Sequence, residues 1–147
     1  MQSPFFLTIY SSPGSGKSHL IRHLLHQLYH SKSPKLQLDI IFVFSGSYFN
    51  GFCQQFIDDE YVTAFSEDWL KRVLHMAKEL KSKGVNKQFV LVFDDCLGST
   101  NWNNKTFNYM VNNHHHYNIS LIIVLQYAKK ILPNFHKNSM YAIVFAQ

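Results

Sequence analysis

Apolar residues occur along this chain in short continuous runs, separated by segments in which apolar residues recur at helical spacing. Because these runs are nearly all apolar and do not alternate with polar residues, they are typical of parallel strands that are covered on both faces. They predict strands over residues 5–10, 38–44, 89–93, 119–125 and 140–146.

Two amphipathic helices are predicted between these strands. The first begins near Lys17 and cannot continue through Pro34, while the second begins after the favourable N-cap residue Ser66 and ends at Gly84. The apolar residues at helical spacing in them are Leu20, Ile21, Leu24, Leu25, Leu28, Trp69, Leu70, Val73, Leu74, Ala77 and Leu80. Other segments are less regular. Residues 100–116 predict a third helix, and residues 45–61 predict an irregular insertion with a short helix.

Strands that alternate with helices indicate an α/β fold, with a mainly parallel sheet as the middle of three layers. A chain of 147 residues can bury one substantial core, so we expect a single domain over residues 1–147. No apolar run approaches the length of about 20 residues that spans a bilayer. The first residues also lack the layout of a signal peptide, so we expect no membrane insertion and a cytosolic compartment.

The segment between the first strand and the first helix has the composition of a phosphate-binding loop. Its glycines allow backbone N–H groups to surround a phosphate, and the following helix directs its positive pole at the anion. Lys17 can then contact the β- and γ-phosphates, and Ser18 can bind Mg²⁺. The first position of the phosphate-binding loop is Ser11, where such loops usually have glycine. A Gly/Ser-rich turn is therefore the alternative interpretation of this segment. The predicted nucleotide-binding residues are Pro13, Gly14, Ser15, Gly16, Lys17, Ser18 and His19.

Polar residues that suit the same chemistry follow two later strands. Asp94 and Asp95 come directly after the run over residues 89–93, in a pattern similar to a Walker B segment. Asp94 is positioned to bind the Mg²⁺ shell, and Asp95 to orient the attacking water. Gln126 ends another predicted strand and can contact the γ-phosphate or that water. An acidic turn and a solvent-facing glutamine are the alternative interpretations.

The charge distribution adds two constraints. A net charge of +5 at pH 7 suggests a polyanionic partner. Only Arg22 and Arg72 among the 14 basic residues are arginines. Kinases usually surround the transferred phosphoryl group with several arginines, so this scarcity argues against them.

The two cysteines, Cys53 and Cys96, lack metal-ligand spacing, and we expect them to be reduced thiols.

Three consecutive histidines, His114, His115 and His116, suggest a metal site at first sight. Adjacent residues on a helix point in different directions, so these three side chains cannot converge on one ion. We therefore expect a polar helix end.

Residues 116–138 read H-Y-N-I-S-L-I-I-V-L-Q-Y-A-K-K-I-L-P-N-F-H-K-N. Together with the phosphate loop, the Ser45-Gly46-Ser47 segment and the acid pair, this block resembles the DNA-packaging ATPases of large DNA viruses and their relatives, in the HerA–FtsK branch of the P-loop ATPases. The resemblance extends over nearly the whole chain. It implies a three-layer P-loop NTPase fold in which the strand over residues 119–125 lies between the first strand and the strand over residues 89–93. With the strands numbered along the chain, the implied order is 5-1-4-3-2.

The resemblance assigns Lys17 and Ser18 to ATP and Mg²⁺, Asp94 to the metal, Asp95 to the water and Gln126 to sensing the γ-phosphate. Lys17, Asp95 and Gln126 are thus the implied catalytic residues. The implied activity is ATP hydrolysis coupled to translocation of double-stranded DNA into a viral capsid by a homo-oligomeric ring. Capsid proteins are further implied partners, and the implied location is the assembly site in the host cytoplasm or the virion.

Two features depart from the family pattern. Its members tend to carry arginine where this chain has His115 and His136, so the positive charge expected from a neighbouring subunit must come from another residue. The candidates are Arg22, Arg72, Lys129, Lys130 and Lys137. Family members also usually continue beyond the position of residue 147, which implies a fragment or a minimal form of the domain.

Two other functions stay open at this point. One is a nucleotide or nucleoside kinase, against which the low arginine content argues. The other is a nucleotide-binding assembly protein that binds ATP without turnover, which the missing family arginines would suit. Steady-state hydrolysis with and without DNA separates all three.

Overall fold

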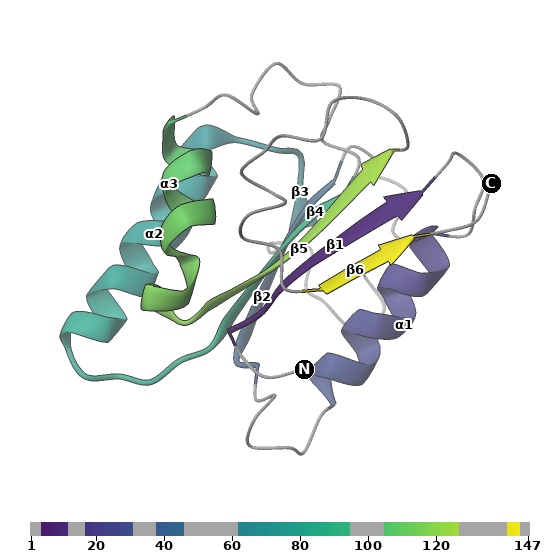
Figure 1. The fold of residues 1–147 in the computed structure, drawn as a ribbon. Helices are drawn as coiled ribbons and strands as arrows, with labels where there is room; N and C mark the ends of the chain where they lie inside the picture. Colours follow the sequence, from purple (N-terminus) through teal and green to yellow (C-terminus); the bar gives the residue numbers. More distant parts are fainter. Residues whose placement is uncertain are drawn as a thin grey trace.

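A single parallel sheet forms the centre of the computed structural model, which describes residues 4–11, 17–30, 38–45, 62–94, 105–126 and 141–144 (Figure 1). The sheet has six strands in the order β3-β2-β4-β5-β1-β6, and every neighbouring pair is parallel. The strands are β1 (Phe6–Ser11), β2 (Ile40–Ser45), β3 (Val62–Thr63), β4 (Phe89–Asp94), β5 (Ile119–Gln126) and β6 (Tyr141–Val144).

This strand order confirms the prediction. The five predicted strands correspond to β1, β2, β4, β5 and β6, and their observed order is 5-1-4-3-2, with β5 between β1 and β4. The short strand β3 was not predicted; its described residues, Val62 and Thr63, pair with β2. Two residues are too few to form a recognisable apolar run. Most of the insertion predicted over residues 45–61 lies outside the described residues.

Helices cover both faces of the sheet, as predicted (Figure 1). On one face, α1 (Lys17–Tyr29) packs Ile21, Leu25 and Leu28 against the sheet. The other face is covered by α2 (Glu67–Ser82), α3 (Lys105–Asn113) and the short 3₁₀ helix η5 (His114–Tyr117).

Alternation within β5 explains why its sequence is apolar at every position from Leu121 to Leu125. Leu121 and Ile123 belong to the core beneath α2 and α3, whereas Ile122 and Val124 belong to the core beneath α1. Successive side chains of a strand point to opposite faces, so a strand covered on both sides favours apolar residues at consecutive positions. The continuous apolar runs therefore reflect two cores rather than one.

The ends of α2 follow from local sequence. Ser66 has extended backbone angles (φ −141°, ψ 127°), and its hydroxyl accepts a hydrogen bond of 3.4 Å from the N–H of Trp69. Gly84 takes a positive φ of 73° just after the helix, a conformation that side chains with a Cβ rarely adopt. Trp69 was predicted from its helical spacing to share one apolar stripe with Leu70 and Val73, but unlike them it is not buried. Its side chain is 38% exposed and lies beside the Arg72 guanidinium.

The segment predicted as a helix over residues 100–116 contains α3 and then η5, and residues 100–104 lie outside the described part. The expectation of a polar helix end is wrong for His114, which is buried. Its Nδ1 donates a hydrogen bond of 2.7 Å to the carbonyl oxygen of Ile119, and its ring packs edge-on against Phe6. Burial lowers the pKa of His114, and the bond to Ile119 partly offsets that effect. His115 and His116 are exposed.

Among the helices that the structure describes, none combines the length and the apolar character that a membrane span requires.

Candidate functional site

Polar residues converge at the carboxyl edge of the sheet because neighbouring parallel strands end there together. Ser11, the last residue of β1, pairs with Gln126, the last residue of β5. Asp94 at the end of β4 pairs on one side with Val124 of β5 and on the other with Ser45 at the end of β2. Four adjacent strands therefore end in serine, aspartate, glutamine and serine.

Asp94 is the acidic residue that this edge places most firmly. Its side chain is only 2% exposed, and Oδ2 accepts a hydrogen bond of 3.4 Å from the hydroxyl of the fully buried Ser45. The preceding residues Phe44 and Phe93 stack with ring centroids 5.2 Å apart, which packs the ends of the two strands against each other. A carboxylate next to a hydroxyl is an oxygen donor set of the kind that Mg²⁺ prefers.

The amino end of α1 lies at the same edge. The helix begins at Lys17, after β1 has ended at Ser11, and it runs back across the sheet with Ile21 and Leu25 in the core. No acidic residue occupies its first turn. Unpaired N–H groups and the helix dipole make such a terminus favourable for an anion.

The structure describes some of the predicted site residues and leaves others outside the described part. Lys17 and Ser18 are the first two residues of α1, the exposed His19 follows them, Asp94 ends β4 and Gln126 ends β5. The structure thus brings the start of α1 and the ends of β4 and β5 to one edge. Residues 13–16 and Asp95 lie outside the described residues, and the roles assigned to all these side chains stay predictions.

Of the candidates for a charge supplied to a neighbouring subunit, Arg72 is exposed on α2, with its guanidinium carbon 5.4 Å from the centre of the Trp69 ring. Arg22 is half-buried on α1. Lys129, Lys130, Lys137 and His136 lie outside the described residues.

Two features went unnoticed in the sequence. The contact between Ser45 and Asp94 depends on the pairing of β2 with β4, although a serine at a strand end was a signal that could have suggested it. A groove lined by lysines between α2 and α3 depends on how these helices pack, and no local pattern indicates it.

The parallel strand order, with β5 inserted between β1 and β4 and a helix starting directly after the β1 loop, defines the fold of the P-loop NTPases. The chain belongs to the Poxvirus A32 protein family, whose model matches residues 1–146. This membership confirms the resemblance to packaging ATPases of large DNA viruses that the sequence indicated.

Individual similar proteins agree with this placement. The chain is 30% identical over 133 residues to the uncharacterized protein 015R of Frog virus 3 (isolate Goorha), with 87% of this chain covered. The chain spans only 39% of the length of that relative. Among solved structures, the genome packaging NTPase B204 from Sulfolobus turreted icosahedral virus 2 in complex with AMPPCP has a TM-score of 0.64 at 19% identity, covering 98% of this chain and 76% of that one. The cytoplasmic domain of EssC has a TM-score of 0.70 at 16% identity, covering 96% of this chain and 32% of that one. At these identities the structures support the fold.

Proposed function

We propose that this chain is the ATP-binding and ATP-hydrolysing domain of a motor that packages viral double-stranded DNA. The observation that carries the proposal is the convergence at the carboxyl edge, where the start of α1 faces the same side as Asp94 and Gln126. Membership of the Poxvirus A32 protein family supports it. Further support comes from B204, a genome packaging NTPase of the same fold that was solved with AMPPCP.

Each residue has one role in this proposal. The loop over residues 13–16 and the N–H groups at the start of α1 bind the phosphates, and the Lys17 ammonium adds a charge-assisted contact. Ser18 and Asp94 are the residues that would hold Mg²⁺, and this ion neutralises charge on the phosphate oxygens when it is bound. Asp95 orients the water, and Gln126, on the strand between β1 and β4, contacts the γ-phosphate.

The proposed assembly is a homo-oligomeric ring that acts on double-stranded DNA together with capsid proteins at the viral assembly site. Two arginines in the chain leave little positive charge for the transition state, so a neighbouring subunit has to supply it.

Binding of a fluorescent ATP analogue to the Lys17→Ala variant tests the nucleotide site. Loss of one charge-assisted contact costs about 1.5–3 kcal/mol, so affinity should fall roughly tenfold or more. Lys87→Ala is the matched control, because it removes the same charge from an exposed loop before β4. Equal affinity in the wild type and both variants would refute the phosphate-loop assignment.

A nucleotide-binding assembly protein without turnover is the second candidate, and the scarcity of arginine favours it. Such a protein would bind ATP in the assay above and show no steady-state hydrolysis with or without DNA. A nucleoside or nucleotide kinase would instead consume ATP only when a phosphoryl acceptor is added.

A further inference from the structure

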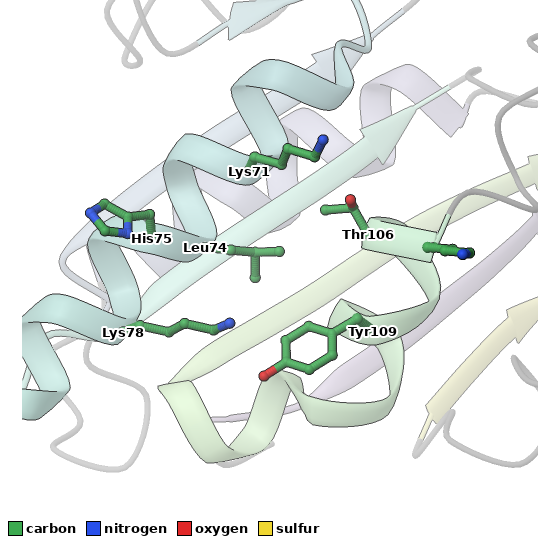
Figure 2. Close-up of a pocket in the computed structure, with 7 residues that line it drawn as sticks. Lys71, Leu74, His75, Lys78, Thr106 and Tyr109 are labelled. Carbon is green, nitrogen blue, oxygen red and sulfur yellow. The ribbon is translucent and has the colours of Figure 1, made fainter.

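A groove of about 420 Å³ lies between α2 and α3 on the face of the sheet opposite α1 (Figure 2). Polar side chains from both helices line it: Lys71, His75, Lys78, Lys105, Thr106 and Tyr109. Leu74, which is 5% exposed, lies between the two rows and belongs to the core below. The groove is thus a basic surface feature separated from the start of α1 by the sheet.

Three groove-lining residues of α2 form a regular row. Lys71, His75 and Lys78 are spaced four and three residues apart, which places them on one side of the helix over a length of about 10 Å. The Lys71 Nζ lies 3.4 Å from Oε1 of Glu67, and the His75 Nε2 lies 3.1 Å from Oε1 of Glu79. These two carboxylates offset part of the positive charge at the rim of the groove.

Positive charge remains at the end of the groove that Lys78 occupies (Figure 2). The Lys78 ammonium lies over the Tyr109 ring at 4.4 Å and over the Tyr117 ring at 5.4 Å. The hydrogen bonds with Tyr117 and with Lys78 lower the pKa of Tyr109. Within the described ranges, no carboxylate forms an ion pair with Lys78 or Lys105. As far as the described residues go, the groove therefore offers ammonium groups to a ligand without first breaking an ion pair at Lys78 or Lys105.

The other wall of the groove adds groups that also suit phosphate. Lys105 is the first residue of α3, and no acidic residue occupies the first turn of that helix. The helix dipole therefore adds to the lysine charge at this end. Thr106 and Tyr109 provide hydroxyl groups. The Thr106 hydroxyl donates a hydrogen bond of 3.1 Å to the Glu67 carboxylate at the rim. Lysines, Thr and Tyr hydroxyls and helix amino ends are the groups that usually contact DNA phosphates.

We propose that the groove between α2 and α3 binds the phosphate backbone of double-stranded DNA. The inference rests on the proposed function, because it places the partner of the motor on a particular surface. The lysines that line the groove on α2 suit a polymer that carries one negative charge per about 1.7 Å of helix axis. An acidic protein partner fits less well. Protein interfaces depend on apolar anchors in buried pockets, and the face of Tyr109 is already covered by Lys78.

The test is the binding of a fluorescein-labelled duplex, followed by anisotropy without nucleotide at several KCl concentrations. The groove variant is Lys71→Gln with Lys105→Gln, both exposed positions. Affinity should fall roughly tenfold, and the slope of log K against log [KCl] should become shallower by about 1.8, since two phosphate contacts are lost. Lys71→Arg with Lys105→Arg keeps the charges and should retain wild-type binding.

A matched control separates a local site from the net charge. Lys83→Gln with Lys87→Gln removes the same charge from exposed positions outside the groove and should leave affinity within about twofold of wild type. An equal loss in the control, or no loss in the groove variant, would overturn the proposal. A groove variant that loses an acidic peptide but keeps the duplex would identify a protein-docking surface and overturn it as well.

Failure of this inference can be distinguished from failure of the proposed function. Duplex binding is measured without ATP, and hydrolysis by the groove variant is measured without DNA. Normal ATP binding with unchanged duplex binding in the groove variant refutes the groove alone. Normal nucleotide affinity in Lys17→Ala refutes the motor without affecting the anisotropy result.

Discussion

The hydroxyl of Ser45 donates a hydrogen bond of 3.4 Å to Oδ2 of Asp94 at the carboxyl edge of the sheet. The two residues end neighbouring strands in register, and both side chains are buried. The direction of the Asp94 carboxylate is therefore fixed by β2 as well as by its own strand. Any ion held by Asp94 depends on this second strand for its geometry.

Ser45→Ala should raise the Mg²⁺ concentration needed for half-maximal ATPase activity more than it lowers activity at saturating Mg²⁺. The reason is that the carboxylate loses one partner and becomes less well oriented. Because the hydrogen bond is long, the loss in unfolding free energy should be about 1 kcal/mol. Magnesium titrations and urea unfolding measure the two effects.

Ser120→Ala is the control for that experiment. The Ser120 hydroxyl is also fully buried and accepts a hydrogen bond of 3.0 Å from the N–H of Phe5. Ser120 lies near the start of β5, away from the carboxyl edge of the sheet. It should destabilise the protein by a similar amount and leave the Mg²⁺ dependence unchanged. Equal Mg²⁺ dependence in both variants would show that Ser45 has a structural role only.

The acid pair should separate metal binding from turnover. Asp94→Asn should weaken the Mg²⁺-dependent part of ATP binding, because an amide is a poorer ligand for this ion than a carboxylate. Asp95→Asn should retain ATP binding and lose turnover, since an uncharged amide orients and polarises the attacking water less effectively than a carboxylate. Asp68→Asn, at an exposed position on α2, is the control. Normal hydrolysis by both variants would reduce the pair to an acidic turn.

Turnover should require assembly. A positive group supplied in trans is worth about 10³ to 10⁵ in rate, and this chain has only two arginines. Specific activity should rise steeply with protein concentration and with added DNA. Inactive Asp95→Asn subunits mixed with wild type should reduce activity more than dilution does. Activity per subunit that stays constant from dilute protein to saturating DNA would contradict a ring motor.

Stability should fall as the pH is lowered through the ordinary pKa of histidine, about 6.5. Burial lowers the pKa of His114 in the folded state, so below pH 6.5 the unfolded chain binds a proton that the folded chain does not. The unfolding free energy therefore rises with pH between the lowered pKa of His114 in the folded state and about pH 6.5. Burial, with smaller contributions from His116 and Lys81, also lowers the pKa of His115 and acts in the same direction.

His114→Asn tests this prediction, because the asparagine amide can replace the Nδ1 donor to the Ile119 carbonyl but does not titrate. Urea unfolding from about pH 8 to about pH 5 should show a weaker pH dependence in the variant than in the wild type. An identical pH dependence would mean that His114 does not contribute.

Much of the fold was predictable because its signals are local. Nearly continuous apolar runs identified five of the six described strands, and Ser66 and Gly84 identified the ends of α2. A strand covered on both faces and a helix terminus each have a characteristic pattern within a few residues of sequence. The 3₁₀ turn that buries His114 has no such pattern, because its burial depends on packing against Phe6 of another strand.

The sequence alone determined the chemistry available to this protein: the loop before Lys17, the acids after the 89–93 run, the glutamine after the 119–125 run and a low arginine content. Tertiary structure decided which of these groups meet. Insertion of β5 between β1 and β4 places Gln126 beside Ser11 at the edge where Asp94 ends β4, and pairing of β2 with β4 sets Ser45 against Asp94. The packing of α2 on α3 likewise gathers Lys71, Lys78 and Lys105 around one groove. These contacts join residues distant in sequence, and they depend on strand order and helix packing, which the side-chain pattern of a single segment does not contain.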